Sequence, residues 1–94
     1  MVEQEVRIVN QLGLHARAAA KLVHLAARYR ATVRLRREHQ EVNGKSILGI
    51  LLLAAGKGTT LLLTCEGDDE QDAMRAIVKL VEDRFEEEPT GKPS

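Results

Sequence analysis

Asn10-Gln11-Leu12-Gly13-Leu14-His15-Ala16-Arg17-Ala18-Ala19-Ala20-Lys21 leads from a loop into an alanine-rich helix, and the rest of the chain is arranged around this junction. The first amide N–H groups of a helix have no intrahelical acceptor, and the aligned peptide dipoles place about half a positive charge at that end. A phosphate group is therefore stabilised at such a helix start. Arg17 adds a guanidinium whose planar set of donors matches phosphate oxygens.

His15 stands at the start of this helix, where its imidazole can accept a phosphoryl group. A neutral ring nitrogen is nucleophilic near neutral pH without an activating base, and a helix N-terminus disfavours the imidazolium form. We therefore predict His15 as the phosphoryl acceptor, Arg17 as the phosphate-stabilising side chain, and a phosphate cradle of three backbone N–H groups, those of Ala16, Arg17 and Ala18. A histidine at a helix start can instead be only a cap, a surface residue or a packed ring.

Hydrophobic periodicity extends the fold in both directions from the junction. Val2, Val6 and Ile8 alternate with polar residues and predict a strand before it. A helix is predicted over 16–28, with an inward face of Ala19, Leu22, Val23 and Ala26. A basic stripe runs along another face of this helix and consists of Arg17, Lys21, His24 and Arg28. The stripe is either a solvated helix face or a docking strip for an acidic partner.

The remaining residues predict three more strands and two more helices. The strands are expected over 31–37, 40–42 and 60–66. Ser46 is predicted as the N-cap of a short apolar helix over 47–53. The last helix follows the acidic segment 67–70, and its predicted inward face consists of Ala73, Ile77, Leu80 and Val81.

The resulting order, β-α-β-β-α-β-α, indicates an α+β fold. Strands of period two need one covered face, and three amphipathic helices are enough to cover one face of a four-stranded sheet. We therefore predict an open-faced β-sandwich in which three helices lie on one face. Residues 1–88 are expected to form one domain, and the chain is expected to fray from Glu86 into a flexible tail over 89–94.

Two separated motifs together resemble a known family. Gly13-Leu14-His15-Ala16-Arg17 and Asn43-Gly44-Lys45-Ser46-Ile47-Leu48-Gly49-Ile50 resemble the signature stretches of the histidine-containing phosphocarrier (HPr) family of the phosphoenolpyruvate-dependent sugar phosphotransferase system. The resemblance runs from about residue 2 to about residue 85 and implies a mostly antiparallel sheet. It also implies that His15 takes a phosphoryl group on Nδ1 from enzyme I and passes it to EIIA-type sugar-permease components or regulatory acceptors. The chain would then be a stoichiometric carrier without a cofactor rather than an enzyme.

Ala18 and Ser46 carry further implications of the resemblance. Most family members have proline where this chain has Ala18, and the change should cost about 0.5 kcal/mol of preorganisation. At the position of Ser46, a bifunctional HPr kinase/phosphorylase acts on relatives in many bacteria. We therefore expect Ser46 to be a regulatory phosphosite whose negative charge inhibits the carrier. A chain that acts only through a Ser46-phosphate-dependent complex with a transcription factor or metabolic enzyme is the alternative.

The short helix over 47–53 is apolar all round, and so small a domain cannot bury every side of it. It is either a loosely covered core helix or a docking patch close to His15, and the resemblance favours docking. The predicted docking surface combines residues from two helices: Ala20, Lys21, His24, Ile47, Leu48 and Leu51.

Composition limits the remaining functions. Fourteen basic and fourteen acidic residues cancel within 94 residues, so no basic field is available for nucleic acid. The β-α-β-β-α-β order also describes an RNA-binding domain, but Tyr29 and Phe85 are the only aromatic residues and neither is expected on an exposed strand. A single cysteine, Cys65, a polar start and the lack of a long apolar run indicate a cytoplasmic protein without membrane insertion. We expect a monomer without a metal site, in which His24 and His39 are surface residues and Cys65 is an inert core thiol.

Overall fold

The computed structural model describes residues 1–87 and confirms the predicted order of elements. The tail predicted over 89–94 lies outside the described residues. The helix predicted over 16–28 ends two residues early, and a short 3-10 turn follows the last helix. The elements are β1 (Val2–Arg7), α1 (Ala16–Ala26), β2 (Thr32–Arg37), β3 (Gln40–Asn43), α2 (Ile47–Leu52), β4 (Thr60–Glu66), α3 (Glu70–Glu82) and η1 (Arg84–Glu86).

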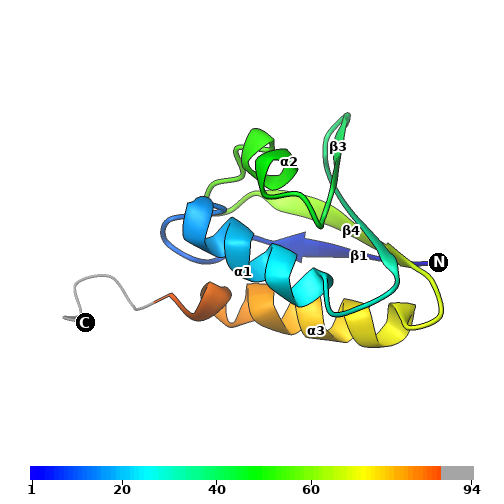
Figure 1. The fold of residues 1–94 in the computed structure, drawn as a ribbon. Helices are drawn as coiled ribbons and strands as arrows, with labels where there is room; N and C mark the ends of the chain where they lie inside the picture. The colour runs from blue at the N-terminus through cyan, green and yellow to red at the C-terminus, as the bar shows by residue number, and fades with distance from the viewer. Residues whose placement is uncertain (88–94) are drawn as a thin grey trace.

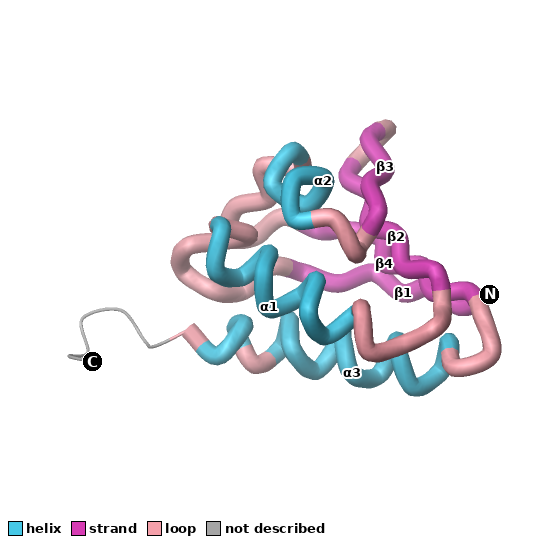
Figure 2. The backbone as a smooth tube through the Cα atoms, in the orientation of Figure 1, coloured by secondary structure: helices cyan, strands magenta, loops and turns pink. Residues whose placement is uncertain are grey.

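The four strands form one sheet in the order β1-β4-β2-β3. Each of its three pairings is antiparallel, so the expected mostly antiparallel sheet is antiparallel throughout. The register places Leu63 opposite Leu35 on one side and opposite Gln4 on the other. Figure 2 shows the β2–β3 hairpin projecting beyond the rest of the sheet, beside α2.

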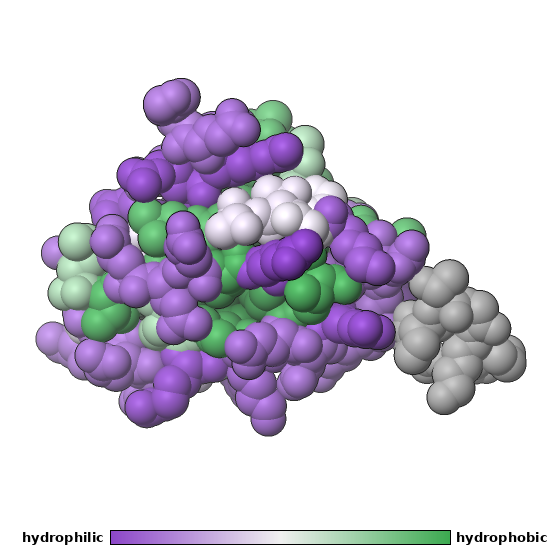
Figure 3. All heavy atoms as spheres, turned by 180° about the vertical axis from the view of Figure 1, so that it is seen from behind, coloured by the Kyte–Doolittle hydropathy of each residue, from purple (hydrophilic) through white to green (hydrophobic). Residues whose placement is uncertain are grey.

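The helices cover one face of this sheet, as predicted. Helices α1 and α3 lie side by side across it, and α2 lies beside α1 and β3 (Figure 1). The inward side chains of the strands, among them Val33, Leu35 and Leu63, are fully buried under the helices. Seen from behind, hydrophilic side chains lie above and below a band of hydrophobic and near-neutral residues (Figure 3). The fold is therefore an open-faced sandwich with its core between the sheet and the helix layer.

The buried faces of the two long helices differ slightly from the prediction. In α1, Ala18 is buried where Val23 was expected, and Val23 is only half-buried. In α3, Met74 is buried and Leu80 is half-buried. Helix α1 contacts α2, α3 and η1, and α3 contacts α1 and η1 as well as β1 and β4, so the buried arc of each helix is displaced toward its helical neighbours. Periodicity identifies an apolar face but not which neighbours will cover its edges.

The prediction that the chain frays from Glu86 is wrong for Glu86 and Glu87, the last two residues that the structure describes. Phe85 is buried in the core, and the side chain of Lys21 donates to its carbonyl oxygen at 2.9 Å. The Lys21 ammonium also pairs with the Glu86 carboxylate at 3.2 Å. An apolar anchor and a cationic clamp from α1 therefore hold the end of the described chain against the molecule.

Candidate functional site

The loop before α1 is fixed by its contact with the segment after α2. Gly13 has a φ of +68°, and a Cβ atom on it would lie 2.6 Å from the carbonyl oxygen of Ala55. The N–H group of the next residue, Leu14, donates to that same oxygen at 2.9 Å. Only glycine fits this backbone conformation and this close approach. The loop therefore delivers His15 to a defined place.

His15 is the N-cap residue of α1, which confirms the predicted helix start. Its Nδ1 atom accepts a hydrogen bond from the backbone N–H of Arg17 at 3.2 Å, and its carbonyl oxygen accepts from Ala19 at 2.8 Å. The acceptor role of Nδ1 means that this nitrogen carries a lone pair rather than a proton. About 31% of the side chain is exposed. His15 thus caps the helix, and this cap places the lone pair of Nδ1 at the positive end of the helix.

The three N–H groups predicted as a phosphate cradle belong to the first turn of α1, directly after His15. Within residues 1–87, the N–H groups of Ala16 and Ala18 donate to no protein acceptor, and that of Arg17 donates only to the histidine ring. The guanidinium of Arg17 is exposed and makes no hydrogen bond or ion pair with any part of the chain that the structure describes. An incoming phosphoryl group would therefore meet unsatisfied amide donors and an exposed cation.

Sequence reasoning missed Glu87 and Asn10, which lie on the other side of the ring. The Oε2 atom of Glu87 lies 3.5 Å from Nε2 of His15 and accepts from the Asn10 side chain at 2.8 Å, while its Oε1 accepts from the N–H of Leu12 at 3.2 Å. The hydrogen bond from Asn10 is the main reason that the pKa of Glu87 lies below its ordinary value. No local pattern links residues 72 or more positions apart. An aromatic residue, Phe85, within the acidic segment is the one signal in the sequence that the chain returns here.

Ser46 is the N-cap of α2, as predicted. Its hydroxyl oxygen accepts from the N–H of Gly49 at 3.0 Å, and the side chain is partly exposed. Helix α2 contains only six residues, so this one cap satisfies a large share of its free amide donors. The hydroxyl is thus both a structural cap and accessible at the surface.

The predicted docking residues divide into exposed and engaged groups. Ile47, Leu48 and Leu51 are 39%, 69% and 37% exposed, whereas Ile50 and Leu53 of the same segment are buried. The short helix therefore presents an apolar outer face, as expected from its composition.

On α1, His24 is exposed, while Ala20 and Lys21 are half-buried. Lys21 is engaged by the C-terminal turn rather than extended into solvent. Together with Arg28 and Glu86, His24 and Lys21 line a hollow of about 280 Å³ between α1 and the end of α3. Part of the basic stripe thus forms the wall of a groove.

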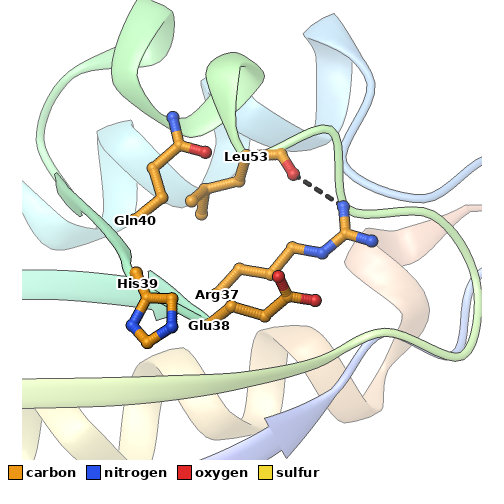
Figure 4. A pocket seen from close by; sticks show the side chains of 5 residues that line it. All are labelled: Arg37, Glu38, His39, Gln40 and Leu53. Atoms are coloured by element: carbon orange, nitrogen blue, oxygen red, sulfur yellow. Dashed lines mark hydrogen bonds between the residues drawn. The ribbon is translucent and has the colours of Figure 1, made fainter.

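Cys65 and His39 contribute nothing to this site. Burial raises the pKa of the Cys65 thiol to about 11, as expected for an inert core cysteine. His39 lines a separate hollow with Arg37 and Leu53, but its ring points away from the guanidinium, which donates to the Leu53 carbonyl at 2.9 Å (Figure 4). Within residues 1–87, no cluster of His, Cys, Asp and Glu has the arrangement of a metal site. Nor does this part of the chain contain a helix with the length and apolar character to cross a membrane.

The fold and site together define a class: small open-faced sandwiches that present one histidine at the start of the first helix. A family model described as the PTS HPr component phosphorylation site matches residues 2–83. The phosphocarrier protein HPr of Pseudomonas aeruginosa is 52% identical over 84 residues, which are 88% of this chain and 93% of the relative. The HPr of Cupriavidus necator is 46% identical over 93% of this chain and 98% of its own. The crystal structure of HPr from Thermoanaerobacter tengcongensis superposes with a TM-score of 0.91 at 40% identity, covering 95% of this chain and all of that one. The chain therefore belongs to the HPr family, the phosphocarrier proteins of the phosphotransferase system.

Proposed function

We propose that His15 accepts a phosphoryl group on Nδ1 from phosphoenolpyruvate-charged enzyme I and passes it to an EIIA-type or regulatory acceptor protein. The observation that carries this proposal is the lone pair of Nδ1 at the N-terminus of α1, where it accepts from the Arg17 N–H. A phosphoryl group on Nδ1 would replace the ring nitrogen as the acceptor for this amide. One helix end can then stabilise both the free and the phosphorylated form of the histidine.

The role of the chain in this reaction is positioning and charge stabilisation rather than turnover. The Nδ1 lone pair attacks phosphorus, the bond to the donor breaks, and the N–H groups of Ala16, Arg17 and Ala18 surround the three phosphoryl oxygens. The Arg17 side chain approaches from solvent and adds charge-assisted hydrogen bonds. The chain is released phosphorylated, so it acts as a stoichiometric carrier without a cofactor.

Incubation of the pure protein with phosphoenolpyruvate and enzyme I tests the proposal. We expect the intact mass to rise by one acid-labile phosphoryl group in the wild type and in His39→Ala, the matched control for an exposed histidine outside the proposed docking surface. His15→Ala should gain none. A phosphorylated His15→Ala protein, or an unmodified wild type beside a competent enzyme I, would contradict the proposal.

We further propose that phosphorylation of Ser46 by an HPr kinase/phosphorylase inhibits transfer to His15. Its support is the accessible hydroxyl at the start of the apolar outer face of α2. A phosphate there would add about two negative charges to a surface that must receive an acidic partner. Ser46→Asp should lower the rate of His15 phosphorylation, while Ser46→Ala leaves it unchanged. An equal rate in both variants would argue against this regulation.

The docking surface for both partners is proposed to combine the exposed residues Ile47, Leu48 and Leu51 with the rim formed by Ala20, Lys21 and His24. Apolar contacts at its centre and basic residues at its edge suit an acidic partner with an apolar anchor. The protein is proposed to act in the cytoplasm as a monomer, without nucleic acid. Leu48→Ala should raise the KM of enzyme I for this protein with little change in kcat, since Leu48 is largely exposed in the free chain and has no role in the proposed transfer step.

A further inference from the structure

The turn after α3 holds three consecutive residues in the left-handed region. Arg84, Phe85 and Glu86 have φ angles of 61°, 54° and 61°, and none of them is glycine. A non-glycine residue in this region is destabilised because its Cβ atom comes too close to the following carbonyl oxygen. A strained turn of this kind persists only where its surroundings determine it. Here these are the buried Phe85 ring and the hydrogen bonds from Lys21.

The result of this turn is the position of the Glu87 carboxylate. Both of its oxygens accept hydrogen bonds from the loop that precedes His15, from Asn10 at 2.8 Å and from Leu12 at 3.2 Å. The carboxylate also lies 3.5 Å from Nε2 of the histidine ring, on the side opposite to the N-terminus of α1. The buried Phe85 ring already anchors this segment to the core, so the contacts of Glu87 are not needed for that purpose.

Asn10 provides independent support because it is fully buried, which is uncommon for a polar side chain. Its amide group donates to the Gly13 carbonyl at 2.8 Å and to Glu87, while its own oxygen has no partner among the described residues. Burial of a polar atom without a hydrogen bond is destabilising. The fold therefore retains a costly buried amide that joins the His15 loop to the Glu87 carboxylate.

We infer that Glu87 is a positioning residue for His15: its carboxylate faces the protonated Nε2 and so keeps the lone pair of Nδ1 directed at the N-terminus of α1. This role presupposes the phosphocarrier function proposed above. A carboxylate at one imidazole nitrogen fixes the tautomer and orientation of the ring for the other nitrogen. The distance of 3.5 Å is that of the free protein, and such contacts commonly shorten when charge develops.

The same carboxylate stabilises the phosphorylated ring. During transfer the Nδ1 lone pair forms the new N–P bond, the bond from phosphorus to the donor breaks, and its electron pair leaves with the donor. Nε2 keeps its proton throughout, so the product ring carries a positive charge. Glu87 then faces an imidazolium rather than a neutral ring, and their attraction favours the phosphorylated state. The other charged side chain next to the ring in sequence, Arg17, acts on the phosphoryl oxygens instead.

Chemical phosphorylation of the histidine tests this role without any partner protein. Phosphoramidate transfers a phosphoryl group to imidazoles directly, and a His24→Gln/His39→Gln background leaves His15 as the only histidine. The ³¹P resonance of phospho-His15 is followed against pH in three proteins: the background, Glu87→Gln, and Glu86→Gln as the neighbouring control. The Gln substitution at position 87 keeps the shape of the side chain and removes its charge.

We expect the midpoint of the ³¹P titration to fall by about 0.5 pH unit in Glu87→Gln, a roughly threefold change in proton affinity. Loss of a nearby negative charge lowers the midpoint because the cationic ring is less stabilised. Glu86→Gln should leave it unchanged, since Glu86 pairs with Lys21 and not with the histidine. Equal midpoints in all three proteins would reduce Glu87 to an anchor of the chain end and overturn the inference.

Phosphorylation of the unaltered chain at Nε2 rather than Nδ1 would overturn it as well. These outcomes are independent of enzyme I, so they are distinct from a failure of the carrier function. If enzyme I does not phosphorylate the wild type but the ³¹P midpoint still shifts, the proposed function is wrong, while the effect of the Glu87 carboxylate on the His15 ring is still demonstrated.

Discussion

Gly13 couples the position of His15 to the loop that follows α2. The glycine combines a positive φ with a backbone contact that leaves no room for a Cβ atom. Because Leu14 donates to the same Ala55 carbonyl that a Cβ atom would strike, any relief of the clash pulls on the histidine loop. Stability and site geometry therefore depend on one residue that has no side chain.

Gly13→Ala should destabilise the protein by about 2–4 kcal/mol and slow the phosphorylation of His15. The strained φ and the overpacking against Ala55 both contribute to this loss. The free energy of unfolding is measured by urea titration. Gly56→Ala is the matched control, since a Cβ atom at Gly56 meets nothing within 4 Å and its φ is not positive. Similar losses for the two variants would show that the close approach at Gly13 is unimportant.

Arg17→Ala should lower the rate of phosphoryl transfer to His15 by about 10- to 100-fold, the loss expected for charge-assisted hydrogen bonds worth 1.5–3 kcal/mol. Arg17→Lys should lose less, because a point charge remains but the planar fork is gone. Stability should hardly change, since the guanidinium is exposed. The measurement is the rate under single-turnover conditions with phosphorylated enzyme I. Arg28→Ala, an exposed arginine of the same stripe, is the control; an equal loss there would indicate docking rather than phosphate contact.

At the scale of elements, α2 depends on its cap more than the longer helices do. Six residues form at most two turns, and such a segment is not stable as an isolated helix. Its inner residues Ile50 and Leu53 tie it to the core, while the Ser46 hydroxyl closes its first turn. Any modification of Ser46 therefore acts on a cap as well as on surface charge.

Ser46→Ala should destabilise the protein by about 1 kcal/mol through loss of the cap. Ser46→Asp should retain most of the stability, because a carboxylate also accepts from the Gly49 N–H and favours the helix N-terminus. Chemical denaturation followed by circular dichroism gives both values. The two variants thus distinguish the capping role of Ser46 from its regulatory role. The Ala variant should lose stability, and the Asp variant should lose transfer rate. A destabilised Asp variant would leave the two effects unresolved and count against inhibition by charge alone.

The elements that the sequence predicts well are those with strong local patterns. Alternation gave the strands, and the three-to-four-residue spacing gave the helices, with boundaries within two residues. The exact arc buried on α1 and α3 was missed at Ala18 and Met74, because it depends on neighbouring helices. The order of residues 85–87 was missed for a similar reason. An acidic segment is expected to be exposed to solvent, and the burial of Phe85 is evident only in the folded structure.

The candidate site divides in the same way. His15 and its helix start are encoded within a few residues, so the motif predicts them together. Glu87 reaches the ring from 72 positions away, and Asn10 reaches Glu87 from 77. Contacts between residues so far apart in the sequence depend on the topology of the whole fold, and no periodic pattern in the sequence indicates them. The half of the site that faces Nε2 therefore became visible only in the folded chain.

At the scale of the whole molecule, carboxylates join distant parts of the chain. Asp69, at the start of α3, accepts from the N–H groups of Arg30 and Ala31 at 2.8 Å each, and Glu70 pairs with the amino group of Met1 at 3.0 Å. The hydrogen bond from the Arg30 backbone is the main cause that lowers the pKa of Asp69, and that from Gly67 lowers the pKa of Glu70. These contacts bind the start of α3 to the loop after α1 and to the chain start.

Acid should therefore weaken the fold. The folded pKa values of Asp69, Glu70 and Glu87 lie below their ordinary values, so the unfolded chain binds protons first as the pH falls. Their stabilising contribution is complete above the ordinary values of 3.8 for Asp and 4.5 for Glu and is lost as the pH drops through the lower, folded values. Urea midpoints measured from neutral pH to about pH 3 should show this decline.

Asp69→Asn should lower the urea midpoint at neutral pH and flatten its decline in acid, because one of the three carboxylates no longer titrates. Asp68→Asn is the control, since Asp68 is exposed and accepts no hydrogen bond within residues 1–87. A decline in Asp69→Asn as steep as that of the wild type would assign the acid sensitivity to other groups.

The two ends of the chain are not equivalent sites for attaching a foreign sequence. The N-terminus lies at the edge of the sheet opposite to the start of α1 (Figure 1), and its ammonium makes a partly exposed ion pair with Glu70. Toward the other end, Glu87, the last residue that the structure describes, lies 3.5 Å from His15. An affinity tag or fluorescent reporter therefore belongs on the N-terminal side, where it costs one surface contact. A truncation before Glu87 should leave the core intact but remove the carboxylate that faces Nε2 of His15. Kinetic measurements on such a protein would then describe an altered site.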